Sequence, residues 1–144
     1  MSTRCHVATR KGLFTFDRGK SAWSIARTSF LGDNCTLVMH DPRSGHILAA
    51  LNHGHFGVKV HRSTDAGATW HEIATPQYPE KPADYVPTTT PVEGKPADWS
   101  LKLVWALAPG GAHEPGVIWC GTLPGGKDRC WRYADHDGFR SLPV

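Results

Sequence analysis

The chain has 144 residues, and its net charge is +3 when its nine histidines are neutral. Its basic residues are scattered, with no run longer than Arg10-Lys11, which excludes the clustered basic surface of a nucleic-acid-binding protein. No apolar stretch approaches the roughly 18 residues of a membrane span, and no apolar signal region begins the chain. We therefore expect one cytoplasmic domain that binds neither nucleic acid nor membrane.

Short β-prone runs bounded by Gly, Pro, Asn or Asp follow one another, and helical periodicity is nearly absent. This pattern is typical of strands joined by tight turns, so the sequence predicts an all-β fold. A Pro-rich segment, residues 76–99, is predicted to be a long irregular insertion. The predicted strands are residues 5–10, 13–17, 22–26, 35–41, 46–52, 58–63, 70–74, 100–108, 116–122, 128–133 and 139–144.

The order of strands and turns repeats along the chain with a period of about 40–50 residues. Residues 34–75 and 100–144 each supply a unit of four strands, and residues 4–28 supply one that lacks its first, innermost strand. Such units are typical of the four-stranded antiparallel blades of a β-propeller. The whole chain, residues 1–144, is then a single partial propeller domain of about 2.75 blades.

One turn between predicted strands, residues 63–70, reads STDAGATW. Its Asp can accept hydrogen bonds from turn N–H groups, its Gly can take a positive φ, and its Trp can pack between blades. A calcium loop would need more oxygen ligands, so a structural role is favoured. Residues 15–23 carry a similar pattern, and residues 135–138 a broken one. The predicted structural residues are Ser63, Asp65, Gly67, Thr69 and Trp70, with Asp17, Gly19 and Trp23 in the earlier copy.

STDAGATW resembles the Asp-box, S-x-D-x-G-x-T-W, of bacterial neuraminidase (BNR) repeats. HVATRKGLFTF and GVIWCGTLPGG likewise resemble blades of sialidase-like propellers of the glycosyl-hydrolase type. The resemblance covers residues 5–126 and implies a propeller of six or more blades, of which this chain is an N-terminal part. It also implies that the box joins the third and fourth strands of a blade and lies away from the ligand face.

The resemblance implies a ligand face formed by the opposite loops. Its candidate residues are Arg10, Lys11, Asp33, His53 and His55. His53 and His55 would face the same side if strand geometry continued through them, and His40 could join them from a neighbouring strand. We considered a metal site there and favour a loop or ligand-contact role instead, with no cofactor.

A sialidase needs three Arg, a Tyr–Glu pair and an Asp, and the Arg-Ile-Pro motif expected ahead of the first box is absent. We therefore expect no catalytic residues. The chain is instead expected to be a non-catalytic module or propeller fragment that acts as a binding or assembly scaffold, with a carbohydrate or another small molecule as its ligand. The alternative is a glycoside hydrolase that needs further blades or a second copy.

The missing inner strand predicts that the chain associates with itself, as a dimer that closes a six-blade ring. Exposed apolar side faces would strengthen this tendency. Trp23, Trp105, Trp119 and Trp131 are candidates to line these faces. Cys35 and Cys120 lie in apolar runs and are predicted to be in the core.

Overall fold

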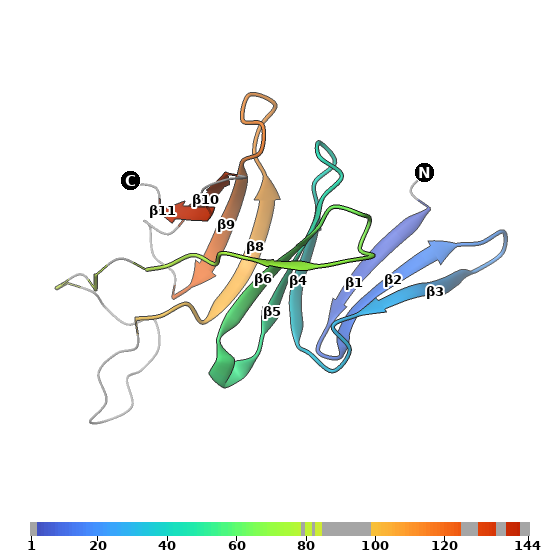
Figure 1. The fold of residues 1–144 in the computed structure, drawn as a ribbon, viewed down its shortest axis with the longest axis horizontal. Helices are drawn as coiled ribbons and strands as arrows, with labels where there is room; N and C mark the ends of the chain where they lie inside the picture. Colours follow the sequence, from blue (N-terminus) through green and yellow to red (C-terminus); the bar gives the residue numbers. More distant parts are fainter. Residues whose placement is uncertain are drawn as a thin grey trace. The chain divides into compact units, whose positions relative to one another are not determined.

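The computed structural model describes residues 3–78, 80–81, 83–84, 99–124, 130–134 and 138–141. The chain divides into two compact units, Met1–Ile73 and Ala74–Val144. All of the longer regular elements are strands, which form three small antiparallel sheets (Figure 1). No helix among the described residues is long and apolar enough to cross a membrane.

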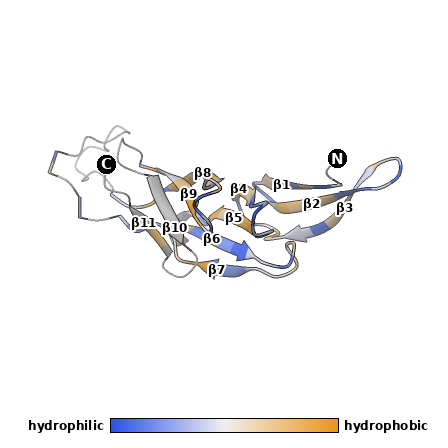
Figure 2. Cartoon of the chain, turned by 90° about the horizontal axis from the view of Figure 1, so that it is seen from above, coloured by the Kyte–Doolittle hydropathy of each residue, from blue (hydrophilic) through white to orange (hydrophobic). Residues whose placement is uncertain are grey.

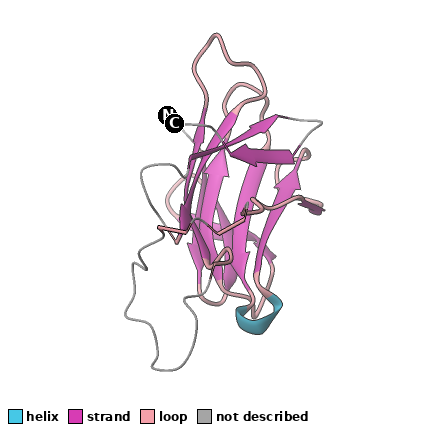
Figure 3. Cartoon of the chain, turned by 90° about the vertical axis from the view of Figure 1, so that its left-hand side faces the viewer, coloured by secondary structure: helices cyan, strands magenta, loops and turns pink. Residues whose placement is uncertain are grey.

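The first unit holds seven strands in two sheets (Figure 1). β1 (Arg4–Thr9), β2 (Gly12–Arg18) and β3 (Trp23–Ser29) form a three-stranded sheet in chain order. β4 (Cys35–His40), β5 (Ile47–Asn52), β6 (Val58–Ser63) and β7 (His71–Ile73) form a four-stranded sheet, also in chain order. A single turn of 3-10 helix, η1 (Gly54–Phe56), joins β5 to β6 and is drawn in cyan in Figure 3.

The core of the first unit lies between these two sheets. Leu13 of β2 packs with Cys35 of β4 and with Ala49 and Leu51 of β5. β5 is buried from Ile47 to Leu51 without alternation, and Figure 2 shows it as hydrophobic along most of its length. Burial raises the pKa of the Cys35 thiol to about 11, so this cysteine stays protonated and behaves as an apolar core residue.

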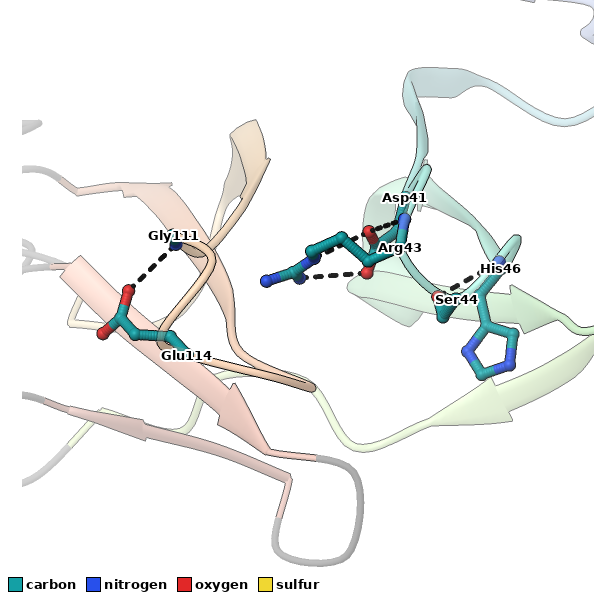
Figure 4. Close-up of polar contacts among 6 residues, drawn as sticks. All are labelled: Asp41, Arg43, Ser44, His46, Gly111 and Glu114. Carbon is teal, nitrogen blue, oxygen red and sulfur yellow. Dashed lines mark hydrogen bonds and ion pairs between the residues drawn. The ribbon is translucent and has the colours of Figure 1, made fainter.

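The second unit holds one four-stranded sheet, β8 (Leu103–Pro109), β9 (Ile118–Leu123), β10 (Cys130–Ala134) and β11 (Gly138–Ser141). Its described core includes Val104, Ile118, Cys120 and Phe139. The loop between β8 and β9 is closed by a hydrogen bond of 3.1 Å from the N–H of Gly111 to the Glu114 carboxylate (Figure 4).

The prediction of an all-β fold is confirmed, and each predicted strand corresponds to an observed strand within a few residues. The sheets contain three, four and four strands, as the repeat predicts. The burial of Cys35 and Cys120 is also confirmed. Most of the predicted insertion and the broken pattern at Asp135, His136 and Asp137 lie outside the described residues.

Candidate functional site

The STDAGATW turn, residues 63–70, joins β6 to β7, the third and fourth strands of their sheet. The Asp65 carboxylate accepts hydrogen bonds from the N–H of Thr69 (2.8 Å), the hydroxyl of Thr69 (2.6 Å) and the hydroxyl of Ser63 (2.8 Å). These bonds, led by that of the Thr69 hydroxyl, hold the pKa of Asp65 well below its usual range. The carboxylate is therefore ionised, and its hydrogen bonds hold the turn closed.

The rest of the turn depends on Ser63 and on a left-handed backbone. The buried Ser63 hydroxyl accepts a hydrogen bond of 2.8 Å from the N–H of Gly67. Ala66 and Gly67 have φ values of 57° and 83°. Glycine adopts this conformation at little cost, which explains why Gly67 occupies the second of the two positions.

The STDAGATW turn is also anchored to the neighbouring sheet. The guanidinium of Arg27 in β3 donates a hydrogen bond of 3.2 Å to the carbonyl of Ala66. The indole N–H of Trp70 donates one of 3.1 Å to the hydroxyl of Ser29, and its ring packs at 5.0 Å from that of Phe30. The turn thus joins the two sheets of the first unit.

The earlier copy of the pattern, residues 15–23, is arranged differently. Asp17 lies within β2 rather than in the turn, and its carboxylate pairs with Arg4 of β1 at 2.6 and 2.7 Å. The N–H of Gly19 closes the turn on the carbonyl of Ala22, and the side chain of Trp23 is 48% exposed. Asp17 therefore pairs with the neighbouring strand, whereas Asp65 bonds within its own turn.

A pocket of about 210 Å³ lies in the first unit, at the end of the sheet where β5 runs into η1. It combines aromatic and aliphatic side chains with two histidines, two carboxylates and one ammonium group. Its lining residues are Phe30, Asp33, Leu51, His53, Phe56, Lys59, His61 and Glu72. This volume is below the roughly 300–1,000 Å³ of pockets for drug-sized ligands, so the pocket suits one small ring or the end of a longer molecule.

The loop after β3 contributes Phe30 and Asp33. Phe30 has a φ of 54°, which is an outlier for a bulky residue. The backbone of Gly12 lies against this loop. A Cβ at Gly12 would be 2.9 Å from the carbonyl oxygens of both Ser29 and Phe30, so the absence of a side chain there allows the loop to follow this path. The carbonyl of Lys11 accepts a hydrogen bond of 3.1 Å from the N–H of Gly32, which holds the loop against the β1–β2 turn.

The opposite side of the pocket comes from the loop around η1. The N–H of His53 bonds to the carbonyl of Gly57 at 3.0 Å, and the Asn52 side chain accepts a bond of 3.0 Å from the N–H of Gly54. These contacts bring Nδ1 of His53 to 3.6 Å from Oδ1 of Asp33. That separation is longer than a hydrogen bond, so the two side chains are close neighbours without a direct bond between these atoms.

β6 and β7 complete the pocket. Nζ of Lys59 lies 2.7 Å from Oε1 of Glu72, and this contact is the main cause that lowers the pKa of Glu72. The His61 ring packs at 4.9 Å from that of Phe30, and its buried Nδ1 has no hydrogen-bond partner. Burial lowers the pKa of His61, so the ring is neutral at neutral pH.

Two of the five residues predicted for the ligand face, Asp33 and His53, lie together in this pocket. The pocket lining does not include Arg10, Lys11 or His55, although the Lys11 backbone supports the loop that carries Asp33. The five predicted residues do not include the other residues that line the pocket, which are Phe30, Leu51, Phe56, Lys59, His61 and Glu72. The alternation of β6 gives a signal for two of these, because Lys59 and His61 share one face of that strand.

The histidine pair considered for a metal is not arranged as proposed. Strand geometry ends at Asn52, and η1 replaces it between His53 and His55. His40 pairs with Ile47, at the opposite end of β5 from His53, so its expected approach is wrong. Among the described residues, no group of three or more His, Cys, Asp or Glu side chains could hold a metal ion.

Comparison with known proteins adds no identity to these observations. No protein-family model matches the chain, and a search of curated proteins gives no match either.

Proposed function

We propose that this chain is part of an Asp-box β-propeller, with one blade for each sheet, and that the pocket of its first unit binds a small ligand without transforming it. The strand counts of three, four and four support the blades. The position of the STDAGATW turn between the third and fourth strands of its sheet also supports them. The engagement of the Asp65 carboxylate within its own turn supports a structural role for the box.

The observation that carries the binding role is the pairing of the Glu72 carboxylate with Lys59 in the pocket. A glycosidase needs a general acid with a raised pKa, opposite a second carboxylate or another nucleophile. Glu72 has a lowered pKa because Lys59 pairs with it. The described lining contains no Tyr, Ser or Cys that could serve as a nucleophile. These side chains suit recognition better than hydrolysis.

Glycoside hydrolysis is the second candidate, since Asp33 and Glu72 both line the pocket and paired carboxylates are what glycosidases use. In that case further blades or a second copy would supply the missing groups. Fluorogenic sialosides and neutral glycosides separate the two candidates. We expect no turnover above the buffer rate. Hydrolysis by the wild type that Asp33→Asn and Glu72→Gln both abolish would replace the binding role with an enzymatic one.

The proposal includes assembly of the chain with a second copy to complete a ring. The antiparallel register places Phe16 opposite Ile25 and Val7 opposite Phe14 on one face of the β1–β2–β3 sheet. Val7, Trp23 and Ile25 are 39%, 48% and 57% exposed. An apolar sheet face of this kind, beside the unpaired edge of β1, favours association.

A further inference from the structure

We propose that the pocket of the first unit selects a neutral ligand with several hydroxyl groups, a polyol or a neutral sugar ring, over an acidic sugar. This inference rests on the proposed binding function and specifies its ligand class. Three properties of the pocket lead to it: its charge balance, its accessible polar side chains and its apolar surface.

The charge balance of the pocket disfavours an anion. Its lining contains two carboxylates, Asp33 and Glu72, and a single ammonium group, Lys59. Lys59 is already paired with Glu72 at 2.7 Å, and no Arg is among the described lining residues. A ligand carboxylate would therefore meet Asp33, and the described lining offers it no Arg and no Lys that is not already paired, so like charges at close range would repel.

The polar atoms of the pocket suit hydroxyl groups. A hydroxyl both donates and accepts a hydrogen bond, so it can pair with the accessible Asp33 carboxylate and with a ring nitrogen of His53, whose side chains are 41% and 27% exposed. Nδ1 of His53 and Oδ1 of Asp33 are 3.6 Å apart, so a hydroxyl oxygen beside them can lie within hydrogen-bond distance of both. Such a hydroxyl would donate to the Asp33 carboxylate and accept from a ring N–H of His53.

The apolar part of the pocket suits the C–H face of a small ring. Phe30 is held in place by its contacts with His61 and Trp70, at ring-centroid distances of 4.9 and 5.0 Å. Its strained backbone is the kind of outlier that clusters at functional sites. Phe56 lies at the pocket with 83% of its surface exposed, so a ligand that covered it would remove a large apolar area from water.

The test is a set of NMR titrations of the full chain, with the ring nitrogens of His53 and His61 as the probes. The titrants are glycerol, D-glucose, D-galactose and D-mannose as neutral probes, and N-acetylneuraminic acid and D-glucuronic acid as acidic probes. We expect at least one neutral probe to shift the His61 ring signals with a millimolar Kd. The acidic probes should bind at least tenfold more weakly than that neutral probe.

Two variants and one matched control connect the binding to the pocket. Asp33→Asn and His53→Phe should each weaken binding of the neutral probe about tenfold, which is the effect of losing one hydrogen bond to a charged or polar group. His55→Phe makes the same change outside the pocket lining and should leave the Kd unchanged. Asp33 and His53 are both partly exposed, so both variants should fold as the wild type does.

The outcomes distinguish this inference from the proposed function. Acidic probes that shift the His61 signals as strongly as the neutral ones would overturn the neutral preference and leave the binding role intact. If none of the probes shifts His53 or His61, both the ligand class and the binding role of the pocket are overturned.

Discussion

Nε1 of Trp70 donates a hydrogen bond of 3.1 Å to Oγ of Ser29, a residue 41 positions earlier in the chain. The bond joins the STDAGATW turn to the end of β3, and the next residue, Phe30, is part of the pocket. The turn therefore does more than reverse the chain, because its Trp fixes the strand end from which the pocket loop departs. Neither residue is itself among the described lining residues of the pocket.

Substitution of Trp70 should destabilise the first unit. Trp70→Phe removes the indole N–H and part of the ring that packs on Phe30, and we expect a loss of about 1–3 kcal/mol in the free energy of unfolding. Ser29→Ala, which leaves the indole N–H without its acceptor, should cost about 1 kcal/mol. Urea unfolding followed by circular dichroism measures both changes.

Trp23→Phe is the matched control, since Trp23 is half exposed on β3 and has no such bond among its described contacts. It should change the stability by less than about 0.5 kcal/mol. Equal losses for Trp70→Phe and Trp23→Phe would contradict the assignment of the stability to the Trp70–Ser29 contact.

Gly12→Ala should disrupt the path of the pocket loop. A Cβ at this position would lie 2.9 Å from two backbone carbonyl oxygens, and the φ of 128° is itself unfavourable for Ala. We expect a cost of about 2–4 kcal/mol, which exceeds the strain of φ alone. Gly45→Ala is the control. It also has a positive φ, of 73°, but has open space around it, so it should cost only about 1 kcal/mol.

The glycine pair is compared by thermal unfolding and by the NMR signals of Phe30 and Asp33. If Gly12→Ala costs no more than Gly45→Ala and leaves those signals in place, the close approach of Gly12 to residues 29–30 does not determine the loop.

Asp41 should contribute stability that depends on pH. Its buried carboxylate bonds to Nε and Nη2 of Arg43 at 2.9 and 3.0 Å and to the N–H of Arg43, in the turn between β4 and β5 (Figure 4). These bonds, chiefly those from the Arg43 side chain, lower the pKa of Asp41 to about 2. Because the folded-state pKa is depressed, the contribution is present above the usual pKa of 3.8 and is lost as the pH falls towards 2.

Asp41→Asn should therefore reduce the free energy of unfolding at pH 7 by about 1–2 kcal/mol, after allowance for the partial exposure of Arg43. The difference between the variant and the wild type should shrink between about pH 4 and pH 2. Urea unfolding at a series of pH values gives this comparison. A difference that stays constant down to pH 2 would show that the cost comes from packing rather than from the charge.

The strands could be predicted from the sequence because their signals are local. Alternation in runs such as VKVHRS and the Gly, Asn and Asp residues between runs place each strand within a few residues. The STDAGATW turn was predictable for the same reason, since Ser63, Asp65 and Thr69 contact one another within seven positions. Contacts of this range follow from residue type and spacing alone.

The pocket was only partly predictable, because distant contacts form it. The position of Phe30 depends on Gly12 and on Trp70, which lie far from it in sequence. Asp17 shows that a local pattern can match while the contacts differ. Its spacing to Gly19 matches that of Asp65 to Gly67, yet Arg4 on the neighbouring strand determines its partner. The sequence pattern contains no sign of that pairing.

The last prediction concerns the exposed apolar face of the β1–β2–β3 sheet. If a second copy covers this face, the wild type should be dimeric or larger in size-exclusion chromatography with light scattering. The double variant Trp23→Gln, Ile25→Thr should shift it towards the monomer. The two residues are 48% and 57% exposed, so their replacement should destabilise the isolated chain little. Leu31→Thr also removes an exposed apolar side chain, 77% exposed, from outside the sheet, and should leave the assembly unchanged. A wild type that is a monodisperse monomer at all concentrations would refute assembly through this face, because an uncovered apolar surface would then be compatible with a stable single chain.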